Sequence, residues 1–245
     1  VGEIEFGSWF TKSKIVGITG SNGKSTVVNI IFSTVKKKYR NTMLGGNVGI
    51  SFCNNVLHEI KAKLKNTIHI LEISSFQLEN IFHFKTDIAC ILNISKDHLN
   101  RYNNFEEYYK TKFKIFNTKN TTYYNHNDLI LKNKFESIKN AIPFSIKSYN
   151  DFKIKKNCIF KKNSGELFID LNKTKLIGKH NLENILASLH ILKRMEIPDL
   201  EIQKSIYSFS PLNHRLEKII INNSPLFIND SKGTNIFSTK VAIDC

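Results

Sequence analysis

The first part of the chain alternates between apolar and amphipathic segments, a pattern that predicts a strand followed by a helix. Residues 14–19 form a short apolar run typical of a buried strand. Residues 26–38 have apolar side chains at helical spacing, at Val27, Ile30, Ile31 and Val35. A glycine-containing turn separates the two segments. The order is therefore strand, turn, helix.

Further runs of the same kind follow along the chain. Segments 67–73 and 86–94 are rich in β-branched and apolar residues, and each precedes polar or helical sequence. Residues 105–116 are expected to form a helix. This alternation predicts an α/β fold with a mainly parallel sheet and helices on both faces, in which ligands bind at the carboxyl ends of the strands.

The second half of the chain has a weaker pattern and ends in what we interpret as a new unit. It contains a candidate strand at 121–124, a hairpin at 158–160 and 166–170, and helices at 180–195 and 200–209. Pro211 marks a break, beyond which 216–221 and 225–228 are candidate strands and 235–245 begins a helix. We therefore predict two domains, at 1–212 and 213–245, the second being the start of another α/β domain.

Composition limits the classes of function. The 245 residues are 41% hydrophobic, enough for a real core, and no apolar run approaches the length that crosses a bilayer. The net charge is +15, but the lysines are scattered, so we expect neither a nucleic-acid partner nor membrane attachment. Four isolated cysteines, at 53, 90, 158 and 245, are typical of free thiols in the cytoplasm. Because the chain begins with Val and ends inside a helix pattern, we expect a fragment.

The turn between the first strand and helix has the features of a phosphate-binding loop. Gly20 and Gly23 would let backbone N–H groups turn toward a polyphosphate, and the helix start adds its positive end. Lys24 would reach the outer phosphates, and Ser25 or Thr26 would supply a hydroxyl for magnesium. The usual glycine five residues before the Gly-Lys pair is replaced by Ile18, so the loop is a variant of the common form.

Acidic and histidine side chains follow the next two predicted strands. Glu72 lies near the end of one strand, where a magnesium ion at the phosphate loop would stabilise its charge. A helix cap or a salt bridge is the alternative for Glu72. Asp97 and His98 follow the other strand, and His98 would bind a second metal or a phosphate unless it is an ordinary surface residue.

Three other polar positions name no reaction by themselves. Lys112 belongs to a basic helix, for which a solvated lysine face is the favoured interpretation. Arg215 and Asp230 lie in polar clusters beside a predicted strand or boundary.

Seven motifs in one order nevertheless point to a known family. They are Thr19-Gly-Ser-Asn-Gly-Lys-Ser-Thr26, Gly45-Gly-Asn-Val-Gly49, Leu71-Glu-Ile-Ser-Ser-Phe-Gln-Leu78, Asp97-His-Leu-Asn-Arg-Tyr102, Gly178-Lys-His-Asn181, His214-Arg215 and Asn229-Asp-Ser-Lys-Gly-Thr-Asn235. From end to end the chain resembles the Mur ligases of peptidoglycan synthesis. The third and last motifs resemble most closely the branch that adds D-glutamate.

The resemblance implies roles for individual residues. The ATP phosphates would be held by Gly20, Ser21, Asn22, Gly23, Lys24, Ser25 and Thr26, and the rest of the nucleotide by Asn184, Arg215 and Asp230. One magnesium would be bound by Ser25 and Glu72, and a second metal would be served by His98 and a carbamylated Lys112. Lys24, His98 and Lys112 would be the catalytic residues. Asn47, Ser74, Lys232 and Thr234 would contact substrates.

The implied reaction is ATP-driven amide formation between UDP-N-acetylmuramoyl-L-alanine and D-glutamate through an acyl phosphate, in a cytoplasmic monomer with ATP and Mg²⁺ as cofactors. Two alternatives remain: another amide ligase, such as a sibling Mur ligase or folylpolyglutamate synthase, or an inactive nucleotide-binding module. Lys96 and Asn100 stand where the family commonly has acidic residues, and Gly233 replaces a usual alanine. The resemblance also implies missing domains at both ends, so we expect no ligase activity from these 245 residues alone.

Overall fold

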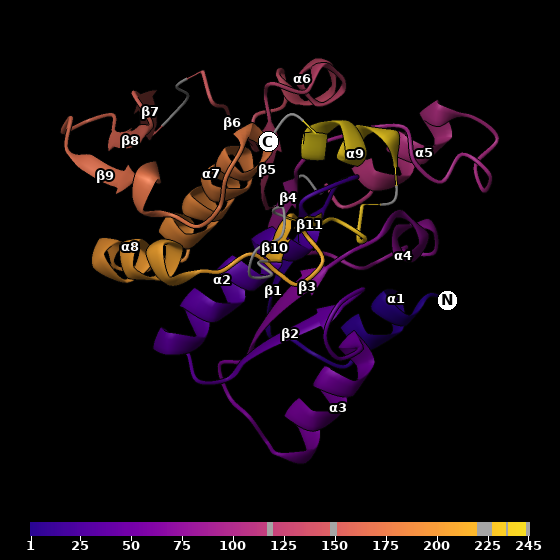
Figure 1. Ribbon diagram of the computed structural model, residues 1–245. Helices are drawn as coiled ribbons and strands as arrows, with labels where there is room; N and C mark the ends of the chain where they lie inside the picture. The colour runs from indigo at the N-terminus through magenta and orange to yellow at the C-terminus, as the bar shows by residue number, and fades with distance from the viewer. Residues whose placement is uncertain (117–119, 148–150, 220–226, 234, 244–245) are drawn as a thin grey trace.

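A computed structural model describes residues 1–116, 120–147, 151–219, 227–233 and 235–243, and its centre is a six-stranded sheet (Figure 1). The strands are β1 (Lys14–Thr19), β2 (Thr42–Gly46), β3 (Ile68–Glu72), β4 (Ile88–Ile91), β5 (Thr121–Asn125) and β6 (Ala141–Phe144). Their spatial order is β2-β3-β1-β4-β5-β6, and every neighbouring pair is parallel. The predicted parallel α/β sheet is confirmed, and β2 and β6 are strands that the sequence pattern missed.

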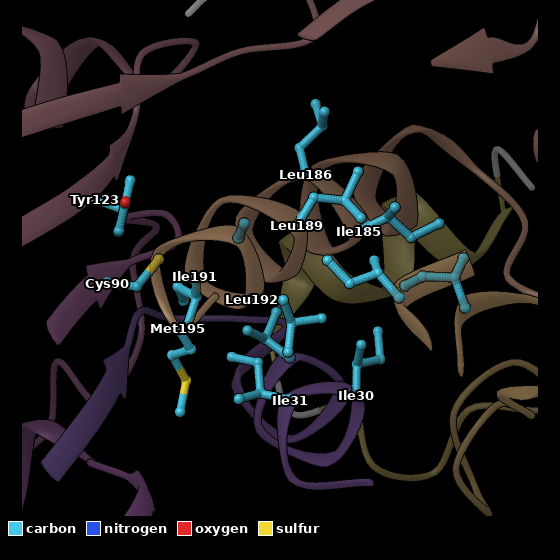
Figure 2. Packing of buried hydrophobic residues seen from close by; sticks show 14 of the residues in the cluster. Ile30, Ile31, Cys90, Tyr123, Ile185, Leu186, Leu189, Ile191, Leu192 and Met195 are labelled. Atoms are coloured by element: carbon cyan, nitrogen blue, oxygen red, sulfur yellow. The ribbon is translucent and has the colours of Figure 1, made fainter. Parts of the chain in front are cut away.

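Helices cover both faces of this sheet. They are α1 (Glu3–Ser8), α2 (Lys24–Lys38), α3 (Phe52–Lys61), α4 (Ser75–Glu79), α5 (Phe105–Phe113), α6 (Leu129–Phe135), α7 (Lys179–Arg194) and α8 (Asp199–Ser208). Side chains alternate along β1, so that Val16 and Ile18 pack with α2, α7 and α8, whereas Ile15 packs with α1, α3 and α6. Figure 2 shows Ile31 of α2 beside Leu192 of α7 in the first of these cores.

A small antiparallel sheet precedes α7. It consists of β7 (Phe152–Lys155), β8 (Cys158–Lys161) and β9 (Leu167–Asp170), followed by the 3₁₀ turn Leu171–Lys173. The predicted hairpin corresponds to β8 and β9, and β7 was not predicted. Phe152 and Phe168 stack at 5.4 Å between ring centroids and join the core around α7. The hydrophobic face of this sheet therefore extends the core beyond the parallel strands.

The last part of the chain forms a separate two-stranded antiparallel sheet, β10 (Glu217–Ile219) and β11 (Phe227–Asn229), followed by α9 (Ile236–Ile243). Parts of the expected strands 216–221 and 225–228, together with Thr234 and Cys245, lie outside the described residues. A separate sheet after residue 212 agrees with the predicted domain boundary, which stays a prediction. Within the described residues, no helix combines the length and apolar character needed to cross a bilayer.

A buried carboxylate fixes the N-terminal helix to the body of the domain. Glu5 of α1 accepts hydrogen bonds of 2.8–3.0 Å from the backbone N–H groups of Phe82, His83 and Phe84, and one of 2.9 Å from the Trp9 indole. Burial raises the pKa of Glu5, but the hydrogen-bond donors together lower it by more, so that the pKa is about 2. The ionised side chain thus joins α1 to the segment between α4 and β4.

Candidate active site

The turn after β1 is shaped to receive an anion at the start of α2. Gly23 precedes the helix with φ of 86°, and no side chain caps the helix N-terminus. Because the first N–H groups of a helix have no partner within it, they are available to a phosphate. A Cβ atom at Gly23 would meet Oδ1 of Asn184 on α7, which is the end of a flexible side chain and can move aside, so the requirement for glycine comes from the positive φ. The predicted order of strand, turn and helix is confirmed, and phosphate binding by the turn stays a prediction.

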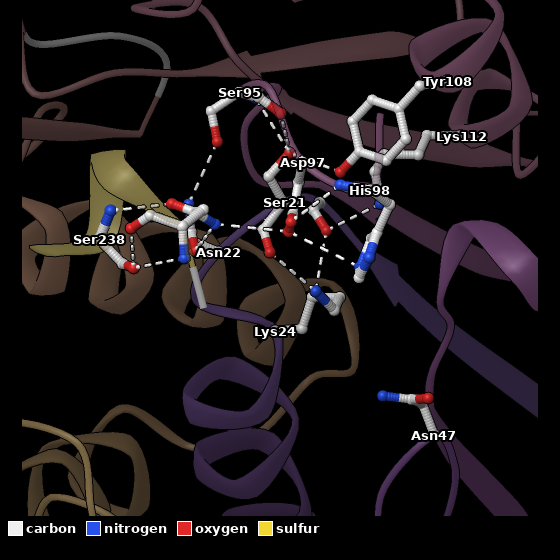
Figure 3. A network of polar contacts seen from close by, with 12 residues as sticks. Ser21, Asn22, Lys24, Asn47, Ser95, Asp97, His98, Tyr108, Lys112 and Ser238 are labelled. Atoms are coloured by element: carbon white, nitrogen blue, oxygen red, sulfur yellow. Dashed lines mark hydrogen bonds and ion pairs between the residues drawn. The ribbon is translucent and has the colours of Figure 1, made fainter. Parts of the chain in front are cut away.

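The first half of the loop is tied to the segment that follows β4. The backbone N–H of Ser21 donates to the carbonyl of Asn93 at 2.9 Å, and the N–H of Asn22 donates to Asn93 Oδ1 at 2.8 Å. Asn93 Nδ2 donates back to the Asn22 carbonyl at 3.0 Å, and Asn22 Nδ2 reaches Ser95 Oγ at 3.2 Å (Figure 3). Sequence reasoning did not single out Asn93 or Ser95, which lie between β4 and the motif Asp97–Tyr102.

Lys24 lies over the loop that it follows. Its Nζ donates to the carbonyls of Gly20 and Ser21, each at 2.9 Å. Burial lowers the pKa of Lys24, the charge of Glu72 opposes this effect, and Arg215 adds to it. A phosphate at the loop would add negative charge next to this buried side chain, in the same sense as Glu72 and Asp97.

Ser25 and Glu72 form a pair of oxygen-bearing side chains below the loop. Ser25 Oγ donates to Glu72 Oε2 at 2.7 Å, and Asn47 Nδ2 donates to Glu72 Oε1 at 2.9 Å. Arg215 Nη2 donates to Ser25 Oγ at 3.0 Å. Glu72 is 3% exposed, and each of its oxygens keeps acceptor capacity beyond one hydrogen bond. A hydroxyl and a carboxylate at this separation are a donor set that Mg²⁺ accepts.

Lys112 is not part of a solvated lysine face, and that expectation is wrong. Its side chain is 2% exposed, and its Nζ donates to the Gly20 carbonyl at 3.0 Å, whereas Lys110 on the same helix is exposed. Burial, reinforced by the nearby charge of Lys24, lowers the pKa of Lys112 well below its usual value. The side chain points from α5 directly at the phosphate loop (Figure 3).

Asp97 and His98 lie at the same edge of the sheet, after β4. His98 has φ of 53° and a side chain that is 42% exposed, and its Nε2 is 3.7 Å from Asp97 Oδ2. Its ring packs against Phe76 at 4.8 Å between centroids. Among the described residues, no group of three or more His, Cys, Asp or Glu side chains is placed to hold a metal ion. A metal at His98 would therefore need ligands of another kind.

A cavity of about 390 Å³ opens beside the loop, between the start of α7 and the segment after α8. Asn184, Asp230 and Lys232, all predicted from the resemblance, line it together with Arg215. His180 and Glu183 line it as well; the sequence analysis quoted His180 within the motif Gly178–Asn181 without giving it a role, and it did not single out Glu183. The cavity is thus continuous with the anion site at Gly23 and large enough for a nucleoside.

Of the other predicted substrate residues, Ser74 lies at the start of α4 and Asn47 lies beside Glu72. Ser74 caps α4, accepting from the N–H of Gln77 at 3.2 Å while Gln77 Oε1 accepts from the Ser74 N–H at 3.0 Å. Asn47 is held to Glu72 by its side chain and its backbone. Thr234 lies outside the described residues.

A phosphate loop after the first of several parallel strands, with a carboxylate at the end of the neighbouring strand, defines a nucleotide-binding α/β domain. Residues 18–192 match the family profile described as the Mur ligase middle domain. The chain belongs to the Mur ligase family.

Its relatives include proteins named UDP-N-acetylmuramoylalanine–D-glutamate ligase. The one from Christiangramia forsetii is 38% identical over 256 residues, and the one from Buchnera aphidicola subsp. Acyrthosiphon pisum is 40% identical over 250 residues. In both cases all of this chain is covered, and 56% and 55% of the relative, respectively. The chain therefore spans about half the length of these relatives.

Solved structures confirm the fold at lower sequence identity. MurF from Acinetobacter baumannii is 17% identical with a TM-score of 0.76, covering 99% of this chain and 56% of that protein. MurF ligase from Thermotoga maritima, solved in complex with ADP, is 19% identical with a TM-score of 0.71, covering 98% and 58%. These similarities establish the shared architecture.

Proposed function

We propose that this chain is the ATP-binding part of a ligase that joins D-glutamate to UDP-N-acetylmuramoyl-L-alanine. The observation that carries the proposal is the loop at Gly23 with the Ser25–Glu72 pair beneath it, in a chain that matches D-glutamate ligases along its whole length. The same proposal describes the complete enzyme as a cytoplasmic monomer that uses ATP and Mg²⁺.

In this proposal the nucleotide occupies the loop and the adjoining cavity. The phosphates lie against the N–H groups at the start of α2 and against Lys24, and Asn184, Arg215 and Asp230 contact the remainder of ATP. Ser25 and Glu72 hold Mg²⁺, which neutralises charge on the phosphoryl oxygens when bound. The oxygen donors fit this metal.

Lys112 fits a second metal only after modification. An ammonium group at Gly20 would repel a cation, but burial and the charge of Lys24 lower the pKa of Lys112, which favours the neutral amine over the ammonium form. We propose that this amine attacks the carbon of CO₂, forming an N–C bond and releasing a proton, so that the side chain becomes a carbamate. With His98 it would then offer an anionic oxygen and a nitrogen ligand on the same side of the loop.

The proposed reaction has two steps. The carboxylate of the muramoyl-alanine attacks the γ-phosphate of ATP and becomes an acyl phosphate, with ADP as the leaving group. The amine of D-glutamate then attacks the acyl carbon and its nitrogen loses a proton, and inorganic phosphate leaves as the amide forms. Lys24 stabilises negative charge on the phosphoryl oxygens, because its Nζ lies at the loop. Asn47, Ser74, Lys232 and Thr234 are assigned to substrate contacts.

The test is a chimera in which these 245 residues replace the matching segment of the Buchnera relative, which supplies the rest of the length. We expect phosphate release that requires both UDP-N-acetylmuramoyl-L-alanine and D-glutamate. Preference for L-lysine, diaminopimelate or a folate would instead identify another amide ligase. ATP binding without release of phosphate under any of these conditions would favour a non-catalytic nucleotide-binding module.

A further inference from the structure

The hydroxyl of Ser21 is fully occupied by other parts of the protein. It donates to the Ser95 carbonyl at 3.0 Å, accepts from the Ser95 N–H at 2.9 Å, and lies 2.9 Å from the hydroxyl of Tyr108. A serine hydroxyl has one hydrogen, and the Ser95 carbonyl can only accept it. The Tyr108 hydroxyl must therefore be the donor to Ser21.

Tyr108 reaches the loop from α5, the helix that also carries Lys112. The two residues are four apart and share one face of the helix, with Lys112 Nζ 4.8 Å from the centre of the Tyr108 ring. Lys112 binds the Gly20 carbonyl and Tyr108 binds Ser21, so that α5 holds two successive residues of the loop (Figure 3). Tyr108 is completely buried, so water does not compete for its hydroxyl.

The two contacts differ in how they depend on carbamylation of Lys112. The bond from Lys112 to Gly20 uses a hydrogen of the free amine, and carbamylation would change that group. The bond from Tyr108 to Ser21 is between two hydroxyls and uses no atom of Lys112.

We infer that Tyr108 is a positioning residue that holds the phosphate loop in its nucleotide-binding conformation by donating its hydroxyl hydrogen to Ser21. The inference rests on the proposed function for its consequence, which is the affinity for ATP. The structural part of the inference, that Tyr108 holds the loop in an ordered conformation, is independent of the proposed function. Tyr108 thereby fixes the loop and Lys112 relative to each other.

Three variants test this: Tyr108→Phe, which removes only the hydroxyl, Ser21→Ala, which removes its acceptor, and the two combined. Tyr102→Phe is the matched control, because it removes a buried hydroxyl bonded to Glu79 at 2.7 Å. Hydrogen exchange of the peptide covering residues 19–26, without any ligand, should be about three- to tenfold faster in Tyr108→Phe and unchanged in Tyr102→Phe. Urea unfolding of all variants shows whether the loss is local.

Nucleotide binding provides the second readout. Calorimetry with MgADP should show affinity lowered about three- to tenfold by Tyr108→Phe. In the chimera the KM for ATP should rise by the same factor with kcat unchanged, because the loop binds substrate and transition state alike. The double variant should bind MgADP no more weakly than Ser21→Ala, since Ser21→Ala already removes the bond to Tyr108 together with the two bonds to Ser95.

Unchanged exchange at residues 19–26 in a folded Tyr108→Phe protein would overturn the inference. So would effects of the two substitutions that multiply in the double variant. If the unaltered chain bound no nucleotide, the proposed function would fail, but the exchange measurement would still decide the role of Tyr108.

Discussion

Replacing Glu5 by Gln should destabilise the domain by an amount that depends on pH. The pKa of Glu5 falls from 4.5 to about 2, despite the burial that opposes this change, because three N–H groups and the Trp9 indole favour the ionised form. A depression of that size corresponds to about 3 kcal/mol of folding free energy at pH 7. This contribution is fully present above pH 4.5 and is lost as the pH falls through about 2, so roughly half remains at pH 3.

The measurement is urea unfolding of the wild type and Glu5→Gln at pH 7 and pH 3, monitored by circular dichroism. We expect Glu5→Gln to lower the free energy of unfolding by about 2–3 kcal/mol at pH 7 and by about half as much at pH 3. Glu106→Gln is the control, since Glu106 is exposed and forms a surface ion pair with Lys110 on α5. A cost at pH 7 below about 0.5 kcal/mol, or one that does not shrink at pH 3, refutes the reasoning.

Three further changes probe the site. Glu72→Gln should lower the Mg²⁺-dependent part of nucleotide affinity by roughly tenfold or more in calorimetry, because a charged metal ligand is lost. Equal nucleotide affinity with and without Mg²⁺ in the wild type would contradict this role of Glu72. Lys112→Arg keeps a cation but has no amine to react with CO₂, so it should slow phosphate release by the chimera more than about a hundredfold. Lys110→Arg should not slow it, and full activity of Lys112→Arg would exclude the carbamate. Gly23→Ala should cost about 1–3 kcal/mol of stability in thermal unfolding and weaken nucleotide binding, because φ is positive and the new Cβ meets Asn184; an unchanged melting temperature would contradict that.

The central elements were predictable because each carries its own local signal. The strand Lys14–Thr19 is apolar from Ile15 to Ile18, and α2 has apolar residues at helical spacing, so their order and the loop between them follow from sequence. Strand β2 was missed because Gly45 and Gly46 have little strand preference, and β6 because it is short and contains Pro143.

The burial of Lys112 shows where a local pattern stops being informative. Periodicity predicts that the segment is helical, but which face of the helix meets the sheet depends on contacts with residues far away in sequence, such as Gly20. Neighbouring Lys110 and Lys114 are exposed and have the same side chain. The resemblance to a family placed Lys112 at the site when composition did not. His180 and Glu183 were given no role for the same reason, because the cavity that they line exists only after α7 packs beside the loop.

The place of β1 at the centre of the sheet has a consequence for how the domain folds. Its two neighbours, β3 and β4, arrive much later in the chain, and both pairings are parallel. Such long-range pairings form slowly, because the entropy of closing a large loop is lost before any stabilising contact forms. The phosphate loop cannot be held by Asn93 and Ser95 until β4 has docked, so affinity for nucleotide should appear late in refolding. A nucleotide that binds only the assembled loop would then stabilise the native state against partly folded chains.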